Sequence, residues 1–330
     1  MIVNSACLTA IQAIEMRERE LHPKDDDLVI KTHAAGICGT DKNLYNGVIP
    51  PSGGLNSEIR TAFGYPYFFG HEGSGTVVEV GKNVRSFKAG DKVMAFGWVE
   101  TFSDYFAATE DDLELVPDGL DEMDLASLGE PIGCAVFSGL CSKVQLGDTV
   151  AVVGMGFAGQ VIAQVVKQKG AFRVIGIDVV DEKLELAKTL GLDQAINSSK
   201  TDPLSAILDL TRGQGADVMV EVAGTAESVQ LCNDAVKHNG VLVFYSWITR
   251  DITLNISRWH DNSLQIVNTG LVHHGTLQRH IWVPQALRPI MQGQIKISPL
   301  ITHCFELNDI DKAMQTANED PTAIKVLVRP

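Results

Sequence analysis

The middle of the chain alternates between short apolar runs and segments whose apolar residues recur with helical spacing. Thr149–Val153 is an apolar run that ends at Gly154. Further runs typical of buried strands are Arg173–Asp178, Asp217–Val222 and Gly240–Tyr245. Helical faces are marked by Val161, Ile162, Val165 and Val166, by Leu184, Ala187 and Leu190, and by Ser228–Val236. Strands that alternate with helices predict a doubly wound parallel sheet with helices on both faces.

The flanking parts of the chain have a different pattern. Residues 25–115 read as short strands broken by glycine-rich turns, for example Leu28–Ile30 and Gly75–Val80, and the chain ends in a predicted strand, Ala323–Val328. We therefore expect both ends to share one β-rich domain with the α/β unit inserted between them. The Pro/Gly/Ser-rich stretch Tyr45–Pro66 predicts a long surface loop, and such loops often face a substrate.

Composition excludes several classes of partner. The 330 residues carry 27 Lys+Arg against 41 Asp+Glu, a net charge of −14, which repels nucleic acid and anionic lipid surfaces. The most apolar stretch, Val150–Val166, is interrupted by three glycines and by the polar Gln160, so we expect no membrane span. The N-terminus lacks the pattern of a signal peptide, and the six scattered cysteines do not resemble a disulfide framework. These features predict a protein of the reducing cytoplasm.

A glycine-rich motif follows the first central strand: Gly154-Met155-Gly156-Phe157-Ala158-Gly159. Gly-x-Gly-x-x-Gly alone is a weak signal, but its position between a predicted strand and a predicted helix is the context of a dinucleotide site. Gly154 permits a tight turn, Gly156 lets the backbone approach a pyrophosphate, and Gly159 allows close packing of helix and strand. The helix N-terminus then offers free N–H groups to the phosphates.

Asp178 ends the second central strand, 19 residues after Gly159. A carboxylate there accepts hydrogen bonds from the ribose hydroxyls of the adenosine and repels a 2′-phosphate. No arginine follows it, since Val179 and Val180 come next. The sequence therefore favours NAD over NADP, although a solvated aspartate at a strand end is the simpler alternative.

Three short segments carry candidate metal ligands. They are Gly36-Ile37-Cys38-Gly39-Thr40-Asp41, Gly70-His71-Glu72-Gly73 and Gly129-Glu130-Pro131. A thiolate, an imidazole and two carboxylates are a donor set for a tetrahedral zinc site that keeps one position open. The segments lie 33 and 59 residues apart, so spacing alone leaves a core histidine and a buried cysteine as the simpler interpretation.

These segments, in this order, resemble the zinc-containing medium-chain dehydrogenase/reductase family, which is alcohol dehydrogenase-like, and especially its polyol branch of sorbitol, threonine and sugar dehydrogenases. The similarity begins near residue 28 and continues to the C-terminus. Besides the three segments, the glycine motif and Asp178, it includes Val77-Val78-Glu79-Val80-Gly81, Gly90-Asp91-Lys92-Val93 and Glu221-Val222-Ala223-Gly224.

The resemblance implies a fold, a site and a reaction. A GroES-like catalytic domain would comprise residues 1–135 and 272–330, and a Rossmann NAD-binding domain residues 136–271. Cys38 and His71 would bind a catalytic zinc ion, with Glu72 and Glu130 as ligand or near-ligand, and Thr40 would pass on the proton of the substrate's hydroxyl. Val222, Ala223 and Gly224 would lie beside the nicotinamide. The expected reaction is NAD-dependent oxidation of a secondary alcohol on a small polyol, sugar, cyclitol or amino alcohol, by a homo-oligomer that is a dimer or a tetramer.

Three features depart from the family pattern. No cysteine lies between Asp91 and Glu130, so the lobe that holds a structural zinc in relatives is missing, and we expect one metal ion per chain. Asn43 stands where relatives of this branch often have histidine, which leaves the proton path beyond Thr40 open. The segment between Cys38 and His71 is also long for the family.

The stretch Trp247–His274 contains four side chains that could hydrogen-bond a hydroxylated substrate: Trp259, His260, His273 and His274. For each of them, packing or surface exposure is the simpler interpretation. Two other functions fit the same scaffold. A metal-free quinone or enone reductase using NAD(P)H would need Cys38 and His71 only as core residues. A non-catalytic nucleotide binder would bind NADH without turning over any polyol.

Overall fold

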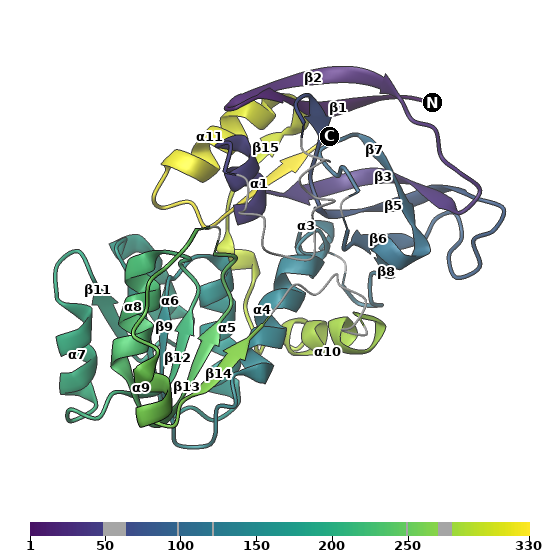
Figure 1. Ribbon diagram of the computed structural model, residues 1–330. Coiled ribbons are helices and arrows are strands. Elements are labelled where there is room, and N and C mark those ends of the chain that lie inside the picture. Colours follow the sequence, from purple (N-terminus) through teal and green to yellow (C-terminus); the bar gives the residue numbers. More distant parts are fainter. Residues whose placement is uncertain (49–63, 98, 121, 249, 270–278) are drawn as a thin grey trace. The chain divides into compact units, whose positions relative to one another are not determined.

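The computed structural model describes residues 1–48, 64–97, 99–120, 122–248, 250–269 and 279–330. The chain forms two compact units, which Figure 1 colours along the sequence. The first unit comprises Met1–Pro131, Val272–Leu287 and Ile301–Pro330, and the second comprises Ile132–Leu271 and Arg288–Leu300. Among the described residues, no helix is both long enough and apolar enough to cross a membrane.

The second unit contains a six-stranded sheet in the order β11-β10-β9-β12-β13-β14, and every neighbouring pair is parallel. Its strands are β9 (Thr149–Val153), β10 (Arg173–Asp178), β11 (Gln194–Asn197), β12 (Ala216–Glu221), β13 (Val236–Phe244) and β14 (Gln265–Asn268). The order reverses between β9 and β12, and such a switch point is where doubly wound sheets bind nucleotides at the carboxyl ends of their strands. The predicted parallel sheet is confirmed.

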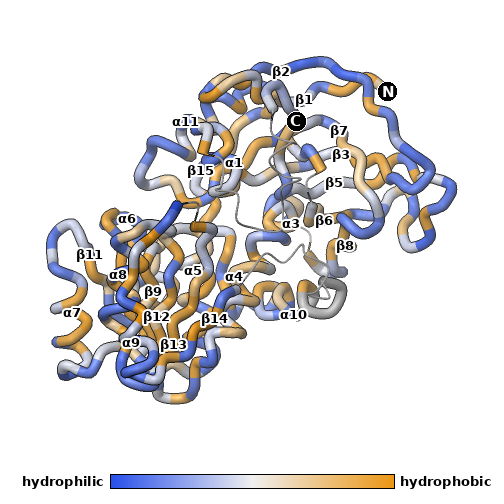
Figure 2. The backbone as a smooth tube through the Cα atoms, in the orientation of Figure 1, coloured by the Kyte–Doolittle hydropathy of each residue, from blue (hydrophilic) through white to orange (hydrophobic). Residues whose placement is uncertain are grey.

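Helices connect these strands, as right-handed parallel crossovers require. They are α5 (Phe157–Gln168), α6 (Asp181–Thr189), α7 (Pro203–Leu210), α8 (Ala226–Ala235) and α9 (Ser257–Asp261). In the sequence, α4 (Gly129–Cys141) precedes β9 and α10 (Arg279–Met291) follows β14. One core cluster joins Ile207 of α7 and Cys232 of α8 to Ala151 and Ile175 of the sheet. Their strand neighbours Val150 and Val152 are buried too, so β9 is apolar on both faces. Hydrophobic residues also predominate where Figure 2 labels β12 and β13.

The first unit is rich in strands, as predicted. A three-stranded sheet has the order β2-β1-β4, and a seven-stranded sheet follows the path β15-β16-β3-β5-β6-β8 with β7 paired to β3. The strands are β1 (Ile2–Ala10), β2 (Ala13–Glu20), β3 (Asp27–Gly36), β4 (Tyr67–Phe68), β5 (Glu72–Val80), β6 (Lys92–Ala95), β7 (Tyr105–Thr109), β8 (Leu113–Leu115), β15 (Ile301–Glu306) and β16 (Lys325–Arg329).

Few helices occur in the described part of this unit: α1 (Gly39–Tyr45), α3 (Met123–Ala126), α11 (Ile310–Glu319), the part of α10 up to Leu287, the first residues of α4 and the 3-10 turns Glu110–Asp112 and Leu307–Asp309. A further 3-10 turn, Ser298–Leu300, belongs to the second unit. Two apolar clusters stabilise the sheets of the first unit. One contains Leu28, Phe106 and Leu113, and the other includes Phe69 and Phe102, whose rings meet edge to face at 4.9 Å.

Strand register in the first unit brings three distant segments together. β3 is antiparallel to β5 with Gly36 opposite Glu72, and antiparallel to β16 with Gly36 opposite Leu327. Cys38 lies two residues after Gly36. In antiparallel pairing it therefore comes near the segment before Glu72 on one side and near Lys325 on the other. The carboxyl end of β3 is therefore the point where residues from all three strands converge.

Candidate metal centre and nucleotide site

Cys38 lies where β3 passes into α1, and hydrogen bonds fix both sides of this junction. The amide of Ile37 donates to the carbonyl oxygen of Val326 at 2.9 Å. Cys38 is the N-cap residue of α1, and its amide donates to the carboxylate of Asp41 at 2.8 Å. A carboxylate in the first helical turn also meets the positive end of the helix dipole. The thiol therefore projects from a well-defined turn.

His71 and Glu72 lie at the start of β5, where the neighbouring backbone leaves room for them. Gly70 precedes them with a φ of 102°, a left-handed conformation that favours glycine. Thr101 Oγ1 donates to the backbone carbonyl of Glu72 at 3.1 Å. On β3, a Cβ atom at Gly36 would overlap a carboxylate oxygen of Glu72. The carboxylate thus occupies space that any larger residue at position 36 would fill.

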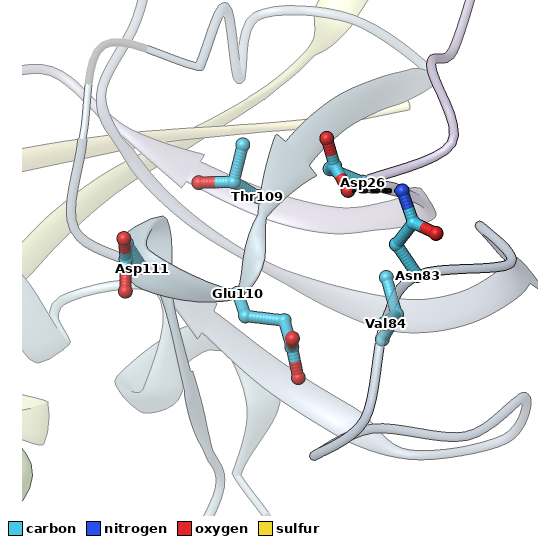
Figure 3. Close-up of a pocket in the computed structure, with 6 residues that line it drawn as sticks. All are labelled: Asp26, Asn83, Val84, Thr109, Glu110 and Asp111. Atoms are coloured by element: carbon cyan, nitrogen blue, oxygen red, sulfur yellow. Dashed lines mark hydrogen bonds between the residues drawn. The ribbon is translucent and has the colours of Figure 1, made fainter.

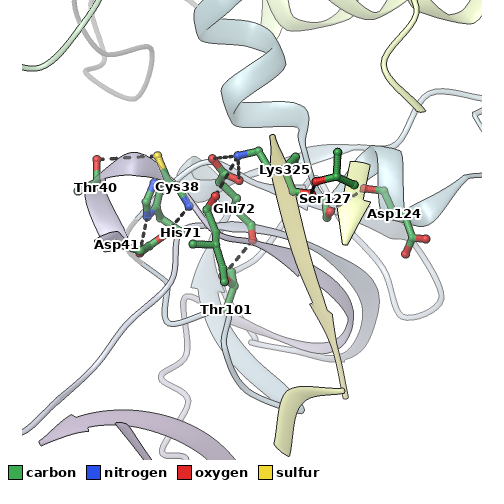
Figure 4. Close-up of polar contacts among 11 residues, drawn as sticks. Cys38, Thr40, Asp41, His71, Glu72, Thr101, Asp124, Ser127 and Lys325 are labelled. Atoms are coloured by element: carbon green, nitrogen blue, oxygen red, sulfur yellow. Dashed lines mark hydrogen bonds and ion pairs between the residues drawn. The ribbon is translucent and has the colours of Figure 1, made fainter. Parts of the chain in front are cut away.

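The structure brings three of the predicted ligands together. The Cys38 sulfur, a ring nitrogen of His71 and a carboxylate oxygen of Glu72 all lie within 4.8 Å of one another (Figure 4). A tetrahedral zinc ion holds its ligand atoms about 3.4–3.8 Å apart, given bond lengths of about 2.0–2.3 Å. The donor types and their separations therefore fit zinc after small side-chain adjustments. His71 and Glu72 are buried, and Cys38 is partly exposed.

Asp41 lies behind this cluster and contacts two of its segments. One carboxylate oxygen accepts the Cys38 amide, and the other lies 3.4 Å from Nδ1 of His71. Burial lowers the pKa of His71, but the charges of Asp41 and Cys38 outweigh it and hold this pKa well above its usual range. A carboxylate behind a metal-binding histidine fixes its ring and raises its basicity. Asp41 stands within the sequence motif that contains Cys38, but no pattern in the sequence indicates its contact with His71.

Protonation and metal binding are linked at this centre. Burial, followed by the nearby Glu72 charge, raises the pKa of the Cys38 thiol. With the pKa of His71 also raised, the ligand atoms hold protons to a higher pH than free side chains would. Because metals bind only the deprotonated forms of these groups, metal uptake must release protons and weaken as pH falls.

Lys325, which the sequence analysis missed, is the cation of the cluster. Its ammonium group donates to both carboxylate oxygens of Glu72, at 3.0 and 2.8 Å, and to the carbonyl oxygen of Ile37 at 3.2 Å (Figure 4). Removing one partner of such a buried ion pair costs about 3–5 kcal/mol. The signal that could have found it is a lysine inside the apolar run Ala323–Val328.

Glu130 and Thr40 lie at the margins of the cluster. Glu130 is buried at the start of α4, outside the group of three ligands, and its charge contributes to raising the pKa of Lys325. Thr40 is partly exposed on α1, with Oγ1 3.9 Å from the Cys38 sulfur. The carboxylate that the structure places among the ligand atoms is thus that of Glu72.

In the second unit, the glycine motif forms the turn between β9 and α5. Gly154 has a φ of 102°, and its amide donates to the carbonyl oxygen of Ile177 at 2.8 Å. Gly156 is the N-cap residue of α5, and a Cβ atom there would meet nothing within 4 Å. A Cβ atom at Gly159 would overlap the carbonyl oxygen of Gly154. Phe157 and Ala158 begin α5, whose free amides suit a phosphate.

The carboxylate of Asp178, at the end of β10, ties the glycine turn to this strand. One oxygen accepts the amide of Met155 at 2.7 Å, and the other accepts the amides of Val179 and Val180 at 2.8 and 3.0 Å. A carboxylate offers about four acceptor positions, so capacity for a ribose hydroxyl remains. Asp178 therefore makes a structural contact and retains acceptor capacity for the predicted contact to the coenzyme.

The segment after β12 is held by a buried carboxylate. Glu221 accepts the amide of Gly224 at 2.7 Å and the hydroxyl of Ser228 at 2.6 Å, and it also accepts the hydroxyl of Ser246. Ala223 lies against Gly154, because a Cβ atom on that glycine would come within 3.0 Å of the Ala223 amide nitrogen. Val222, Ala223 and Gly224 are thus placed at the switch point, next to the phosphate-binding turn.

The residues predicted to contact substrate are only partly described. Trp259 Nε1 donates to the Asn233 side chain at 2.8 Å and the indole packs on the sheet core, while His260 is exposed. His273 and His274 lie outside the described residues, as does most of the predicted loop, residues 49–63. For Trp259, packing is the better interpretation.

An acidic pocket of about 260 Å³ lies in the first unit (Figure 3). It is lined by Asp26, Asn83, Val84, Thr109, Glu110 and Asp111. Asp26 immediately precedes β3 and Cys38 closely follows it, so this pocket and the metal centre lie at opposite ends of a ten-residue strand. Asp26 accepts the side chain of Asn83 at 2.7 Å, and Glu110 accepts the amide of Arg85 at 3.1 Å, which indicates a structural role for these carboxylates.

Both units match known protein families. Residues 24–118 match the family model of the alcohol dehydrogenase GroES-like domain, and residues 158–282 match that of zinc-binding dehydrogenases. An L-threonine 3-dehydrogenase of Bacillus licheniformis is 30% identical over 338 residues, which cover 93% of each chain.

Solved structures share the fold over the whole chain. The 2R,3R-butanediol dehydrogenase of Bacillus subtilis has a TM-score of 0.84 at 24% identity, covering 99% of both chains. The benzyl alcohol dehydrogenase of Acinetobacter calcoaceticus has a TM-score of 0.87 at 20% identity, covering 100% of this chain and 99% of its own. A protein of Sinorhizobium meliloti solved with NADP has a TM-score of 0.84 at 23% identity, with both chains fully covered.

Proposed function

The chain belongs to the zinc-containing medium-chain dehydrogenase/reductase family, and from this premise we propose that it is a zinc-dependent, NAD-linked dehydrogenase of a small hydroxylated substrate. Its relatives support the broader statement that it is an oxidoreductase acting on a CH–OH group. The proposed substrate is a secondary alcohol on a polyol, sugar, cyclitol or amino alcohol. Relatives named for L-threonine and 2,3-butanediol both act, by their names, on small molecules of this kind.

The convergence of Cys38, His71 and Glu72 within 4.8 Å carries this proposal. These residues would hold the zinc ion, with Glu130 nearby as a further carboxylate. Zinc supplies Lewis-acid chemistry that lowers the pKa of an alcohol hydroxyl. Asp41 holds the His71 ring from behind, and the turn at the start of α1 holds Cys38. A core histidine and a buried thiol without a ligand role would not require a third ligand atom so close to both.

Thr40 is the residue proposed to take the hydroxyl proton. It is partly exposed and its Oγ1 lies 3.9 Å from the Cys38 sulfur, so a substrate hydroxyl near the cluster would be within its reach. Asn43, one helical turn further along α1, cannot relay a proton as histidine does. We therefore propose that the proton passes from Thr40 directly to water.

The nucleotide site of the second unit would bind NAD. The amides at the start of α5 and the turn from Gly154 to Gly159 suit the pyrophosphate, and Val222, Ala223 and Gly224 lie at the switch point where the nicotinamide half is expected. The nicotinamide supplies the hydride acceptor. Hydrogen bonds to the carboxylates of Asp178 and Glu221 hold the two loops that flank this site.

A substrate screen on protein purified without chelator tests this function. We expect about one zinc ion per chain, and reduction of NAD⁺, followed at 340 nm, with at least one member of a panel of polyols, sugars, cyclitols and amino alcohols that includes L-threonine. Chelation should abolish the activity and zinc should restore it. Metal-free protein that reduces quinones or enones with NADPH would instead support a reductase, and NADH binding without any turnover would support a nucleotide binder.

The coenzyme preference has its own prediction. Replacing Asp178 with alanine should weaken NADH binding by about 10- to 100-fold, because a hydrogen bond to a charged group contributes about 1.5–3 kcal/mol. NADPH should bind the variant better than it binds the wild type, since the repulsion of the 2′-phosphate is removed. Fluorescence titrations with both reduced coenzymes measure this.

Asp181→Asn is the matched control, because it removes an exposed carboxylate three residues away that pairs with Lys200. It should leave the ratio of the two dissociation constants unchanged. Tighter NADPH than NADH binding by the wild-type protein would contradict the proposed preference for NAD.

A further inference from the structure

Lys325 is a buried cation placed among the anions of the metal centre. It is 4% exposed, and it donates to both oxygens of Glu72 and to the carbonyl oxygen of Ile37. The charges of Cys38 and Glu130 also act on it. Glu72 itself is fully buried, so each charge depends on its neighbours inside the protein for stabilisation.

Packing does not explain a lysine at this position. β16 continues with Val326, Leu327 and Val328, all of which are buried. A lysine is among the residues least often fully buried, and an unbranched apolar side chain such as methionine has a similar length without the cost of burying a charge. The ammonium group of Lys325 instead donates to both oxygens of the Glu72 carboxylate, a pairing that methionine could not make.

We propose that Lys325 is a positioning residue that competes with the metal ion for the carboxylate of Glu72 and thereby lowers the metal affinity of the centre. The proposal rests on the proposed function, in which Glu72 is one of the ligands. With both oxygens hydrogen-bonded to an ammonium group, the carboxylate has less negative charge to offer a metal. A metal ion that takes up this carboxylate must share it with Lys325 and must tolerate a positive charge close by.

The ligand atoms indicate what such competition would change, namely the strength of the metal ion as a Lewis acid. A thiolate and a fully available carboxylate would together neutralise a divalent ion and reduce its strength as a Lewis acid. Lys325 offsets part of the charge of Glu72, so the ion at this centre keeps more of its positive charge for a substrate oxygen. Lys325 would therefore lower the metal affinity of the centre and raise the Lewis acidity of the bound ion.

Metal affinity measured without turnover tests the proposal. We expect Lys325→Met to bind Zn²⁺ about 10- to 100-fold more tightly than the wild type in competition with a chromophoric chelator, the range over which groups contacting metal ligands usually act. With Co²⁺ as a spectroscopic probe, the visible absorption of the variant should differ from that of the wild type, because Glu72 coordinates more fully.

The Glu72→Gln background separates competition from simple repulsion. If Lys325 acts through Glu72, the larger part of the Lys325→Met effect on metal affinity disappears in Glu72→Gln/Lys325→Met, and the Co²⁺ spectra of these two proteins agree. This double variant also removes both buried charges, so it remains informative where an unpaired Glu72 would prevent folding. Lys312→Met, on the exposed face of the same unit, is the control and should leave the affinity unchanged.

Two results would overturn the inference. Lys325→Met that binds Zn²⁺ no more tightly than the wild type would show that Lys325 does not compete, and an equal gain in both backgrounds would show repulsion without competition. Failure of the proposed function looks different, because the wild-type protein itself would then bind neither Zn²⁺ nor Co²⁺ at this centre.

Discussion

The Cys38→Ser variant is expected to lose its metal ion, and its kcat/KM for the alcohol should fall by more than about 100-fold. Its dissociation constant for NADH should stay within about twofold of the wild-type value. Changes in groups that only contact metal ligands already cost about 10- to 100-fold, and a serine hydroxyl is a far poorer zinc ligand than a thiolate. The glycine turn and Asp178, which are proposed to bind the coenzyme, belong to the second unit, whereas Cys38 belongs to the first. Metal analysis, steady-state kinetics and fluorescence titration measure the three quantities.

Cys304→Ser provides the control, since Cys304 is an exposed thiol on β15 of the same unit. It should keep its metal ion and its activity. The metal-centre interpretation fails if Cys38→Ser retains full activity and one zinc ion per chain, because Cys38 would then be a core residue only.

Local patterns predicted most of the second unit. The predicted strands Thr149–Val153 and Arg173–Asp178 are β9 and β10 with the same bounds, because a buried parallel strand reads as a continuous apolar run wherever the rest of the chain lies. The glycine motif was equally local, since its strand, turn and helix are consecutive. Boundaries elsewhere shift by a few residues, as with the predicted helix Ser228–Val236, which is α8 at Ala226–Ala235.

The metal centre depended on information that a local pattern lacks. Cys38, His71 and Glu72 meet because β3 pairs with β5 in one particular register, and a shift by one residue would turn the ligands to the other face. Only the resemblance to a family implied that these residues meet. Lys325 lies 253 positions after Glu72 in the sequence, so no spacing rule connects the two. The role of Gly36 could not be predicted from the sequence either, because this glycine acts by leaving space for the Glu72 carboxylate.

Asp41 and Lys325 would adjust the two proposed ligands His71 and Glu72 in opposite directions. The buried anion behind His71 strengthens that imidazole as a ligand and holds its ring. The buried cation beside Glu72 weakens that carboxylate. Both groups lie within reach of the Cys38 segment, through its amide and through the neighbouring carbonyl of Ile37. Under the proposed function, the metal affinity would therefore be set by a small charge network and not by the ligand atoms alone.

Gly159→Ala is expected to lower both folding stability and coenzyme affinity. The new Cβ atom would overlap the carbonyl oxygen of Gly154, which is backbone and cannot move without displacing the turn. Overpacking of this kind costs about 1–3 kcal/mol, and a displaced turn should weaken NADH binding by about 10- to 100-fold. Chemical denaturation and NADH titration measure the two effects.

Gly156→Ala separates the two roles of the turn, because a Cβ atom at Gly156 meets no protein atom within 4 Å. Its φ of −70° and ψ of −166° are an extended conformation that alanine also adopts, and losing glycine at an N-cap costs only about 1 kcal/mol or less. We expect this variant to stay folded yet bind NADH as poorly as Gly159→Ala, since the methyl group would occupy the approach of the pyrophosphate. Unchanged NADH binding by Gly156→Ala would mean that the phosphates do not reach this turn, and the coenzyme would have to bind elsewhere on the second unit.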